Sequence, residues 1–193
     1  MKKTPSLFRR AYEGDRRARD ELVPGSEWVA AGEGLAHRKL DGTCCLVEDG
    51  VFYKRFNAGK GKVPPPDFMP AQPDPDPVTT HWPGWVPVLR KDPASKYHVQ
   101  AWDRQCFFLP DGTYELIGPK IQGGAEVDVH RGFPTLVAHT DLPVPDAPRD
   151  FAGLQAFLEA RPTWEGLVWH HPDGRKVKVK LRDFTGMGRG TSA

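Results

Sequence analysis

The sequence predicts an α+β protein built mostly from antiparallel strands, with peripheral helices and one long loop. Three Asp-Gly pairs separate runs of β-favouring residues: Asp49-Gly50, Asp111-Gly112 and Asp173-Gly174. This dipeptide fits the type I′ turn of a tight hairpin, because both central residues of that turn need positive φ. Only one segment has a well-formed amphipathic helical pattern, so strands are expected to dominate.

The elements follow from these signals in chain order. Residues 6–22 are polar with few apolar anchors and are predicted to form a helix that packs on an edge. Hairpins are predicted at 43–56, 105–117 and 166–181. The amphipathic helix is predicted at 150–160, with Asp150 as its N-cap.

Residues 61–87 hold nine of the twenty prolines. Proline removes a backbone donor and restricts its neighbour, so this segment is predicted to be a long ordered loop. Trp82 and Trp85 are expected to pack its second half against the rest of the protein.

Composition limits the function classes. The 193 residues are 38% hydrophobic and 27% charged, which is typical of a soluble globular protein and is consistent with one domain spanning 1–193. A net charge of +2 is not the strongly basic balance expected of a passive nucleic-acid binder.

The three cysteines show no CxxC spacing, which argues against a structural zinc site and favours a reducing compartment. No run reaches the roughly 20 apolar residues of a membrane span, so a cytoplasmic protein is expected.

The strongest candidate for chemistry is the run Lys39-Leu40-Asp41-Gly42. Alone it is a weak signal, because an exposed lysine before a turn has the same sequence. The first hairpin strengthens it: a two-residue turn at Asp49-Gly50 places Arg55 across from Cys44, two residues beyond Gly42. Glu115 then interrupts an apolar strand, although strand alternation could also leave it in solvent.

The third hairpin gathers charges on one face. Lys176, Lys178 and Lys180 alternate with apolar residues, so they share a face. A two-residue turn at Asp173-Gly174 would pair Lys178 with Trp169 and Lys180 with Leu167, leaving Glu165 diagonal to Lys180. An exposed ladder of ion pairs would have the same pattern, but it would leave apolar side chains in its middle. The mixture therefore favours a pocket wall.

In order, these elements are Lys-x-Asp-Gly, an arginine, a strand glutamate, Glu-Gly and Lys-x-Lys. This order resembles the covalent nucleotidyltransferase superfamily of ATP-dependent ligases and capping enzymes. The local sequences are similar to a small 5′-3′ RNA ligase family: KLDGTCC at 39–45, PGWVPV at 83–88, YELIGPKIQGG at 114–124 and EGLVWHHPDG at 165–174. The resemblance implies a ligase-type adenylyltransferase domain.

The resemblance also implies roles for individual residues. Lys39 would become linked to AMP, and Lys178, with Lys180 beside it, would bind the α-phosphate. Glu115 would hold the ribose hydroxyls or orient a metal ion, Mg²⁺ or Mn²⁺, and Glu165 would help to position the metal and the lysine. The remaining predicted nucleotide contacts are His37, Arg38, Asp41, Gly42, Arg55 and Phe133, with His139 as a rival to Phe133 for stacking on the base.

The implied reaction joins RNA ends. Lys39 would attack the α-phosphorus of ATP, AMP would pass to a 5′-phosphate, and a 3′-hydroxyl would displace it. Many relatives carry an oligonucleotide-binding domain after the last lysine strand. No such domain is expected here, because eleven residues follow Arg182.

Other functions stay open at the level of sequence. A DNA ligase or a GTP-using capping enzyme would keep the same fold and the same lysine. A non-catalytic nucleic-acid-binding module is a third possibility, although the near-neutral charge argues against it. A covalent AMP adduct would separate the enzymes from the module.

Overall fold

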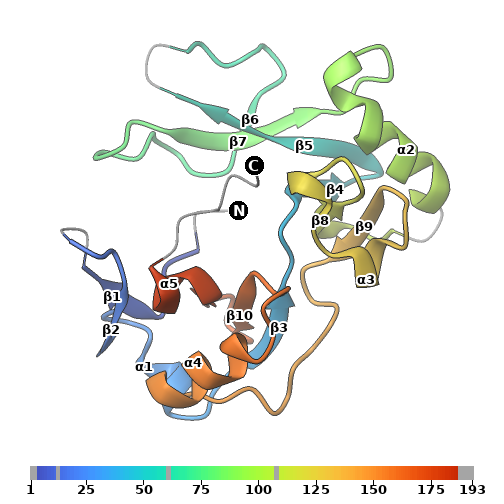
Figure 1. Ribbon diagram of the computed structural model, residues 1–193. Helices are drawn as coiled ribbons and strands as arrows, with labels where there is room; N and C mark the ends of the chain where they lie inside the picture. The colour runs from blue at the N-terminus through green and yellow to red at the C-terminus, as the bar shows by residue number, and fades with distance from the viewer. Residues whose placement is uncertain (1–3, 12–13, 60–61, 107–108, 187–193) are drawn as a thin grey trace. The chain divides into compact units, whose positions relative to one another are not determined.

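The computed structural model describes residues 4–11, 14–59, 62–106 and 109–186. These residues form two compact units. Unit 1 runs from Asp41 to His139, and unit 2 combines Thr4–Leu40 with the chain from Thr140 onward. The fold is α+β with antiparallel pairing between the strands of its sheets, as the sequence predicts (Figure 1).

Unit 1 is organised around a six-stranded sheet with the order β6-β7-β5-β4-β8-β9. Its strands are β4 (Thr43–Glu48), β5 (Val51–Ala58), β6 (Met69–Pro70), β7 (Trp82–Pro87), β8 (Gly112–Ile117) and β9 (Thr135–Ala138). Its helical segments are η1 (Pro93–Ser95), α2 (Lys96–Gln105), η3 (Gln122–Gly124) and α3 (Val127–His130).

Helix α2 covers one face of this sheet. Ala101 of α2 is fully buried in a cluster with Cys45, Tyr114 and Leu116 from the central strands. Because strand side chains alternate, the residues between them in sequence, including Cys44 and Glu115, project from the opposite face. The covered face therefore supplies this hydrophobic cluster, and the opposite face carries Cys44 and Glu115.

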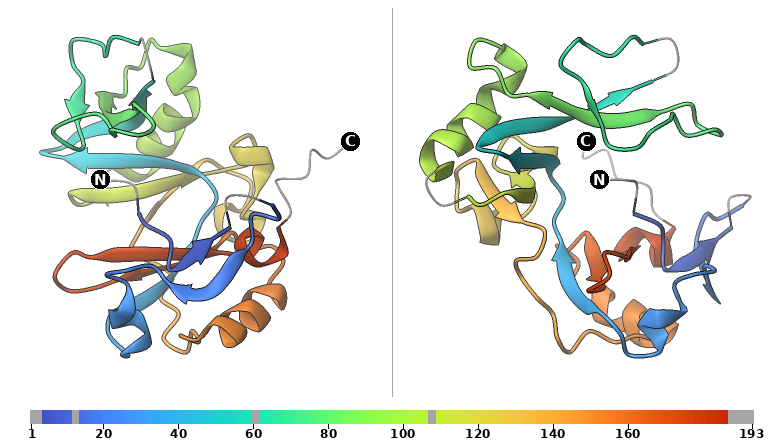
Figure 2. Two further views of the ribbon diagram at one scale, coloured as in Figure 1. Left: turned by 90° about the vertical axis from the view of Figure 1, so that its left-hand side faces the viewer. Right: turned by 180° about the vertical axis from the view of Figure 1, so that it is seen from behind.

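Unit 2 contains a three-stranded sheet with the order β11-β10-β3 and a separate β1-β2 hairpin. The strands are β1 (Phe8–Arg10), β2 (Ala18–Leu22), β3 (Leu35–Lys39), β10 (Gly166–His170) and β11 (Lys176–Lys180). The helices are α1 (Glu27–Ala30), α4 (Phe151–Glu159) and α5 (Leu181–Thr185). The β10–β11 hairpin is drawn in orange to red in Figure 2.

The core of unit 2 lies on one face of its three-stranded sheet. Leu167, Trp169, Val177 and Val179 are almost completely buried there. Leu154 and Leu158 of α4 are fully buried in the same cluster. The apolar alternation of β10 and β11 therefore fixes which face of the sheet is available for chemistry.

Two sequence predictions are confirmed closely. The 43–56 hairpin has the predicted two-residue turn, with Glu48 paired to Val51. The 150–160 helix is α4, and the Asp150 side chain accepts a hydrogen bond from the Gly153 backbone N–H at 2.8 Å.

The polar helix predicted at 6–22 is wrong. This segment contains the β1-β2 hairpin, with Phe8 paired to Leu22 and Arg10 to Ala18. Leu7, Phe8 and Ala18 are buried in the core of unit 2. Burial of these anchors within paired strands outweighs the weak helical preference of the charged residues between them.

The hairpin predicted at 105–117 is also wrong. The segment before Asp111 contains the end of α2, and β8 pairs instead with β4 and β9. The pair Asp111-Gly112 therefore lies at the start of β8 and not in a hairpin turn.

The predicted loop at 61–87 is only partly correct, because β7 is a six-residue strand paired along β5. Trp85 is buried, as predicted, with an exposed fraction of 3%.

Candidate active site

The candidate nucleophile Lys39 ends strand β3 of unit 2. Strand β10 pairs with β3 on one side and with β11 on the other, so Gly166 lies between Lys39 and Lys180. Residues paired across a sheet point to the same side. Two lysines are thus held on one face, and the strand position between them carries no side chain. A Cβ atom at Gly166 would lie 2.0 Å from the Val179 carbonyl oxygen, so the close pairing of β10 and β11 requires glycine.

The register of the third hairpin differs from the prediction by one residue. Lys178 pairs with Val168, and Lys180 pairs with Gly166. Five residues connect the strands in place of a two-residue turn. The predicted pairing would have mixed Leu167 and Trp169 with lysines. The observed register sends both into the apolar core, and that burial decides the register.

Glu165 bridges the two lysines. One of its carboxylate oxygens accepts a hydrogen bond from Lys39 Nζ and the other accepts one from Lys180 Nζ. The three side chains are largely buried, with exposed fractions of 21% for Lys39, 12% for Lys180 and 11% for Glu165. The third hairpin predicts Glu165 close to Lys180, and the structure brings Lys39 to the same carboxylate.

Burial disfavours the charged forms of the groups in this cluster, and the neighbouring charges modify their pKa values. Desolvation works against ionisation of Glu165, but the two ammonium groups outweigh it and hold the pKa of the carboxyl below its usual range. Burial, together with repulsion from Lys39, lowers the pKa of Lys180, and Glu165 offsets part of that change. Removing the carboxylate would leave two buried ammonium groups close together, which favours loss of a proton from one of them.

His37 and Lys178 lie on the same sheet face as Lys39. Both residues pair with Val168 of β10, His37 from β3 and Lys178 from β11. His37 is 5% exposed, and burial, assisted by Lys176, lowers its pKa. Arg38 lies on the other face, where its guanidinium stacks 4.8 Å from the centre of the Trp164 ring. The two residues predicted to lie near adenine thus point in opposite directions.

The other half of the Lys-x-Asp-Gly motif belongs to unit 1. The Asp41 backbone N–H donates to Glu126 Oε1 at 3.0 Å. Gly42 runs close to β8, so a Cβ atom there would lie 2.3 Å from the Leu116 carbonyl oxygen. This close approach is the physical reason for glycine at position 42.

Glu126 is a residue that sequence reasoning missed. It is 4% exposed and adopts a left-handed backbone conformation with φ of 65°. A buried carboxylate in that conformation is costly unless its contacts compensate. No periodicity marks Glu126 in the sequence, and the preceding Gly123-Gly124 pair indicates only a turn.

Arg55 lies where the hairpin register predicts. The ladder between β4 and β5 reaches the pair Cys45–Lys54, so Cys44 and Arg55 follow as neighbours. Burial lowers the pKa of Arg55, and the nearby Cys44 acts in the opposite direction. Its guanidinium also stacks 5.0 Å from the centre of the Trp85 ring.

Glu115 also belongs to unit 1, where it pairs across the sheet with Cys44. Its Oε2 lies 2.9 Å from His139 Nε2. His139 was considered from sequence only as a base-stacking residue, and its contact with Glu115 was not foreseen. Phe133 lies in the segment between α3 and β9, is 50% exposed and has the Arg104 guanidinium 4.2 Å from its ring centre.

The predicted site residues therefore form two sets. Unit 2 brings together Lys39, Glu165 and Lys180, with His37 and Lys178 on the same sheet face. Unit 1 holds Asp41, Gly42, Arg55, Glu115 and Phe133. The two carboxylates predicted to bind metal fall in different sets, and both oxygens of Glu165 are bonded to ammonium groups.

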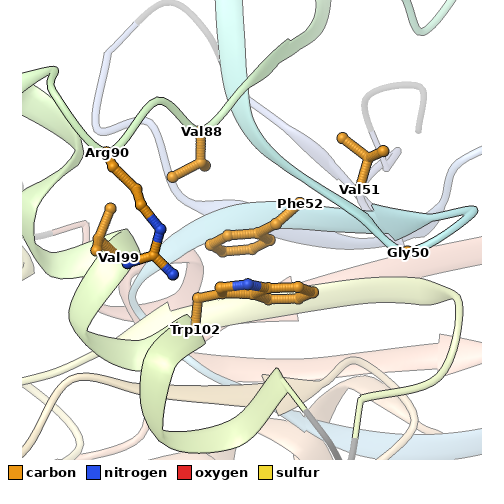
Figure 3. Close-up of a pocket in the computed structure, with 7 residues that line it drawn as sticks. All are labelled: Gly50, Val51, Phe52, Val88, Arg90, Val99 and Trp102. Carbon is orange, nitrogen blue, oxygen red and sulfur yellow. The ribbon is translucent and has the colours of Figure 1, made fainter.

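A separate depression in unit 1 contains none of these residues. Phe52 and Trp102 stack in parallel at its base, 5.0 Å between ring centres, with Arg90 beside them (Figure 3). It lies on the face of the sheet that α2 covers, so it is distinct from the face that carries Glu115.

No helix in the described parts of the chain is long and apolar enough to cross a membrane. No protein-family model matches the chain, and no curated protein is found to be similar to it. The resemblance to RNA ligases thus stays a prediction that rests on the motifs themselves.

Proposed function

We propose that this protein is an ATP-dependent RNA ligase that joins 5′-phosphate and 3′-hydroxyl ends through a lysyl-AMP intermediate on Lys39. The observation that carries the proposal is the largely buried Lys39–Glu165–Lys180 cluster. It places the lysine of a Lys-x-Asp-Gly motif among cations, on a sheet face that also carries Lys178. Cations in such a site attract a triphosphate and favour a neutral amine.

Glu165 has a defined part in this proposal. It accepts hydrogen bonds from both ammonium groups, offsets one of their two positive charges and keeps Lys39 in one position. An arriving α-phosphate would compete for Lys180 and weaken the bridge. Lys39 would then release a proton to solvent, and its amine nitrogen would form a bond to the α-phosphorus as the bond from that phosphorus to the pyrophosphate oxygen breaks. Lys178 and Lys180 would stabilise the charge that develops on the phosphoryl oxygens.

Mg²⁺ or Mn²⁺ is expected to accompany ATP and neutralise its phosphates. The protein groups predicted to bind it do not present an open set of oxygen ligands. Both oxygens of Glu165 are occupied by lysines, and Glu115 lies against an imidazole. The proposed chemistry therefore rests on the lysines and not on a protein-bound metal ion. The three cysteines are thiols, which is consistent with the cytoplasmic location proposed here.

The direct test is transfer of label from [α-³²P]ATP to the protein. Wild-type protein should become labelled, and Lys39→Ala and Lys39→Arg should not. Lys91→Ala, which removes an exposed lysine of unit 1, is the matched control and should label normally. Labelling of Lys39→Ala at the wild-type level would refute the proposal.

A second assay identifies the substrate. The labelled protein should join a 5′-phosphorylated oligoribonucleotide to a 3′-hydroxyl end. Parallel reactions with each nucleoside triphosphate, and with DNA in place of RNA, separate the RNA ligase from a DNA ligase or a capping enzyme. Labelling by GTP alone, or joining of DNA alone, would assign the chain to one of those classes.

A further inference from the structure

A second cluster of reactive side chains lies on the face of the unit 1 sheet opposite helix α2. Cys44 of β4 pairs with Glu115 of β8, so their side chains project together. His139 directly follows β9, and its backbone N–H donates to the Thr113 carbonyl at 3.1 Å. That bond continues the β8–β9 ladder and brings the imidazole to the same face.

The three side chains are close enough to bind one ion. One ligand atom each from Cys44, Glu115 and His139 lies within 4.8 Å of the other two. His139 Nε2 and Glu115 Oε2 are 2.9 Å apart. A tetrahedral zinc ion with the usual bond lengths needs about 3.3 Å between nitrogen and oxygen ligands, so a small side-chain movement suffices.

From this geometry we propose that Cys44, Glu115 and His139 form a binding site for a thiophilic divalent cation of the Zn²⁺ class. Thiolate and imidazole ligands select such ions over Mg²⁺, which prefers oxygen ligands alone. Three protein ligands leave a fourth position open to water or another small donor. The absence of a CxxC spacing hid this site in the sequence, because its ligands come from β4, β8 and the residue that follows β9.

Thr113 completes the arrangement around the imidazole. Its Oγ1 lies 2.9 Å from His139 Nδ1. Metal-binding histidines usually donate their second N–H to an oxygen acceptor, which fixes the tautomer. When no ion occupies Nε2, Nε2–H can donate to Glu115. With the ion on Nε2, the proton resides on Nδ1 and is donated to Thr113.

Charge also balances at this site. When the ion binds, Cys44 releases its thiol proton to solvent as the sulfur–metal bond forms. The thiolate and the Glu115 carboxylate together neutralise a divalent cation. Arg55 is the neighbouring cation, and it faces a neutral assembly once the site is filled.

The test uses the full chain after treatment with a chelator and removal of the chelator, with no nucleotide present. Titration with Co²⁺ should produce an intense near-ultraviolet thiolate-to-cobalt band at one equivalent, and Zn²⁺ should abolish it. Cys44→Ser should remove the band. His139→Ala and Glu115→Gln should weaken Co²⁺ binding roughly tenfold or more. Cys106→Ser, a partly buried cysteine outside the cluster, should bind as the wild type does.

A second measurement avoids dependence on how the variants fold. Zn²⁺ should protect Cys44 of the wild-type protein from alkylation, while alkylation of Cys106 is unchanged, as mass spectrometry of peptides can show. A cobalt band that persists in Cys44→Ser, or the absence of both band and protection, would overturn the metal site. Neither readout depends on adenylation, so this inference and the proposed function can fail separately.

Discussion

Units 1 and 2 each place a glutamate on one face of an antiparallel sheet, with different results. Glu165 in unit 2 lies between two ammonium groups, whereas Glu115 in unit 1 lies beside an imidazole and a thiol. The first arrangement suits phosphate chemistry, and the second suits a thiophilic metal ion. The neighbours supplied by adjacent strands, not the carboxylate itself, therefore determine what each glutamate can do.

The largest expected effect separates the two glutamates. Glu165→Gln should lower the rate of adenylation roughly 100-fold, because the amide cannot accept a hydrogen bond from both lysines and so cannot hold them in position. Cobalt binding by unit 1 should not change, since Glu165 takes no part in it. Both quantities can be measured on one protein preparation. Loss of the cobalt band together with adenylation would mean that the substitution disrupts the whole protein.

Two glycines test the close backbone contacts that each unit needs. Gly166→Ala and Gly42→Ala should each destabilise the protein by roughly 3 kcal/mol or more, because a Cβ atom would collide with a backbone carbonyl. Thermal unfolding measures the loss. Gly59→Ala is the control, since a Cβ atom added at that position would have nothing within 4 Å. Equal melting temperatures for all three variants would contradict the close contacts.

The pH dependence of stability should report on unit 1. Burial, with Lys54 acting in the same direction and Asp92 against it, lowers the pKa of His98 to about 4. The unfolded chain binds a proton at this histidine below about pH 6.5, whereas the folded chain does not until about pH 4. Stability should therefore fall by up to about 3 kcal/mol as the pH drops through this window.

The contribution of His98 can be isolated by substitution. His98→Leu should flatten the pH dependence of denaturant unfolding between pH 6.5 and 4. His37 in unit 2 shifts in the same direction, so some slope should persist. An unchanged slope in His98→Leu would show that this histidine is protonated in the folded protein.

The smallest expected effect concerns the start of α4 in unit 2. Asp150→Ala should cost about 1 kcal/mol, because the Gly153 N–H loses its side-chain acceptor. Asp150→Ser should restore most of that loss in chemical denaturation. In unit 1, no side-chain hydrogen bond caps the start of α2, so no matching loss is expected from capping there.

The sequence alone determined the local features of this protein. The two-residue turn at Asp49-Gly50, the capped helix after Asp150 and the alternating lysines of β11 are set by residues within one turn or one strand, so their patterns were sufficient. The same alternation correctly predicted that Lys176, Lys178 and Lys180 share a face. These features depend on backbone preferences and side-chain periodicity, which neighbouring residues express directly.

Only the tertiary structure decided features that depend on distant partners. The β10–β11 register follows from burying Leu167 and Trp169, and the β1–β2 hairpin follows from burying Leu7 and Phe8. The Lys39–Glu165 contact joins residues 126 positions apart, and the Cys44–Glu115–His139 cluster joins two strands and the residue after a third. Such contacts arise when the core selects one pairing among several with similar local preference, so no short pattern in the sequence specifies them.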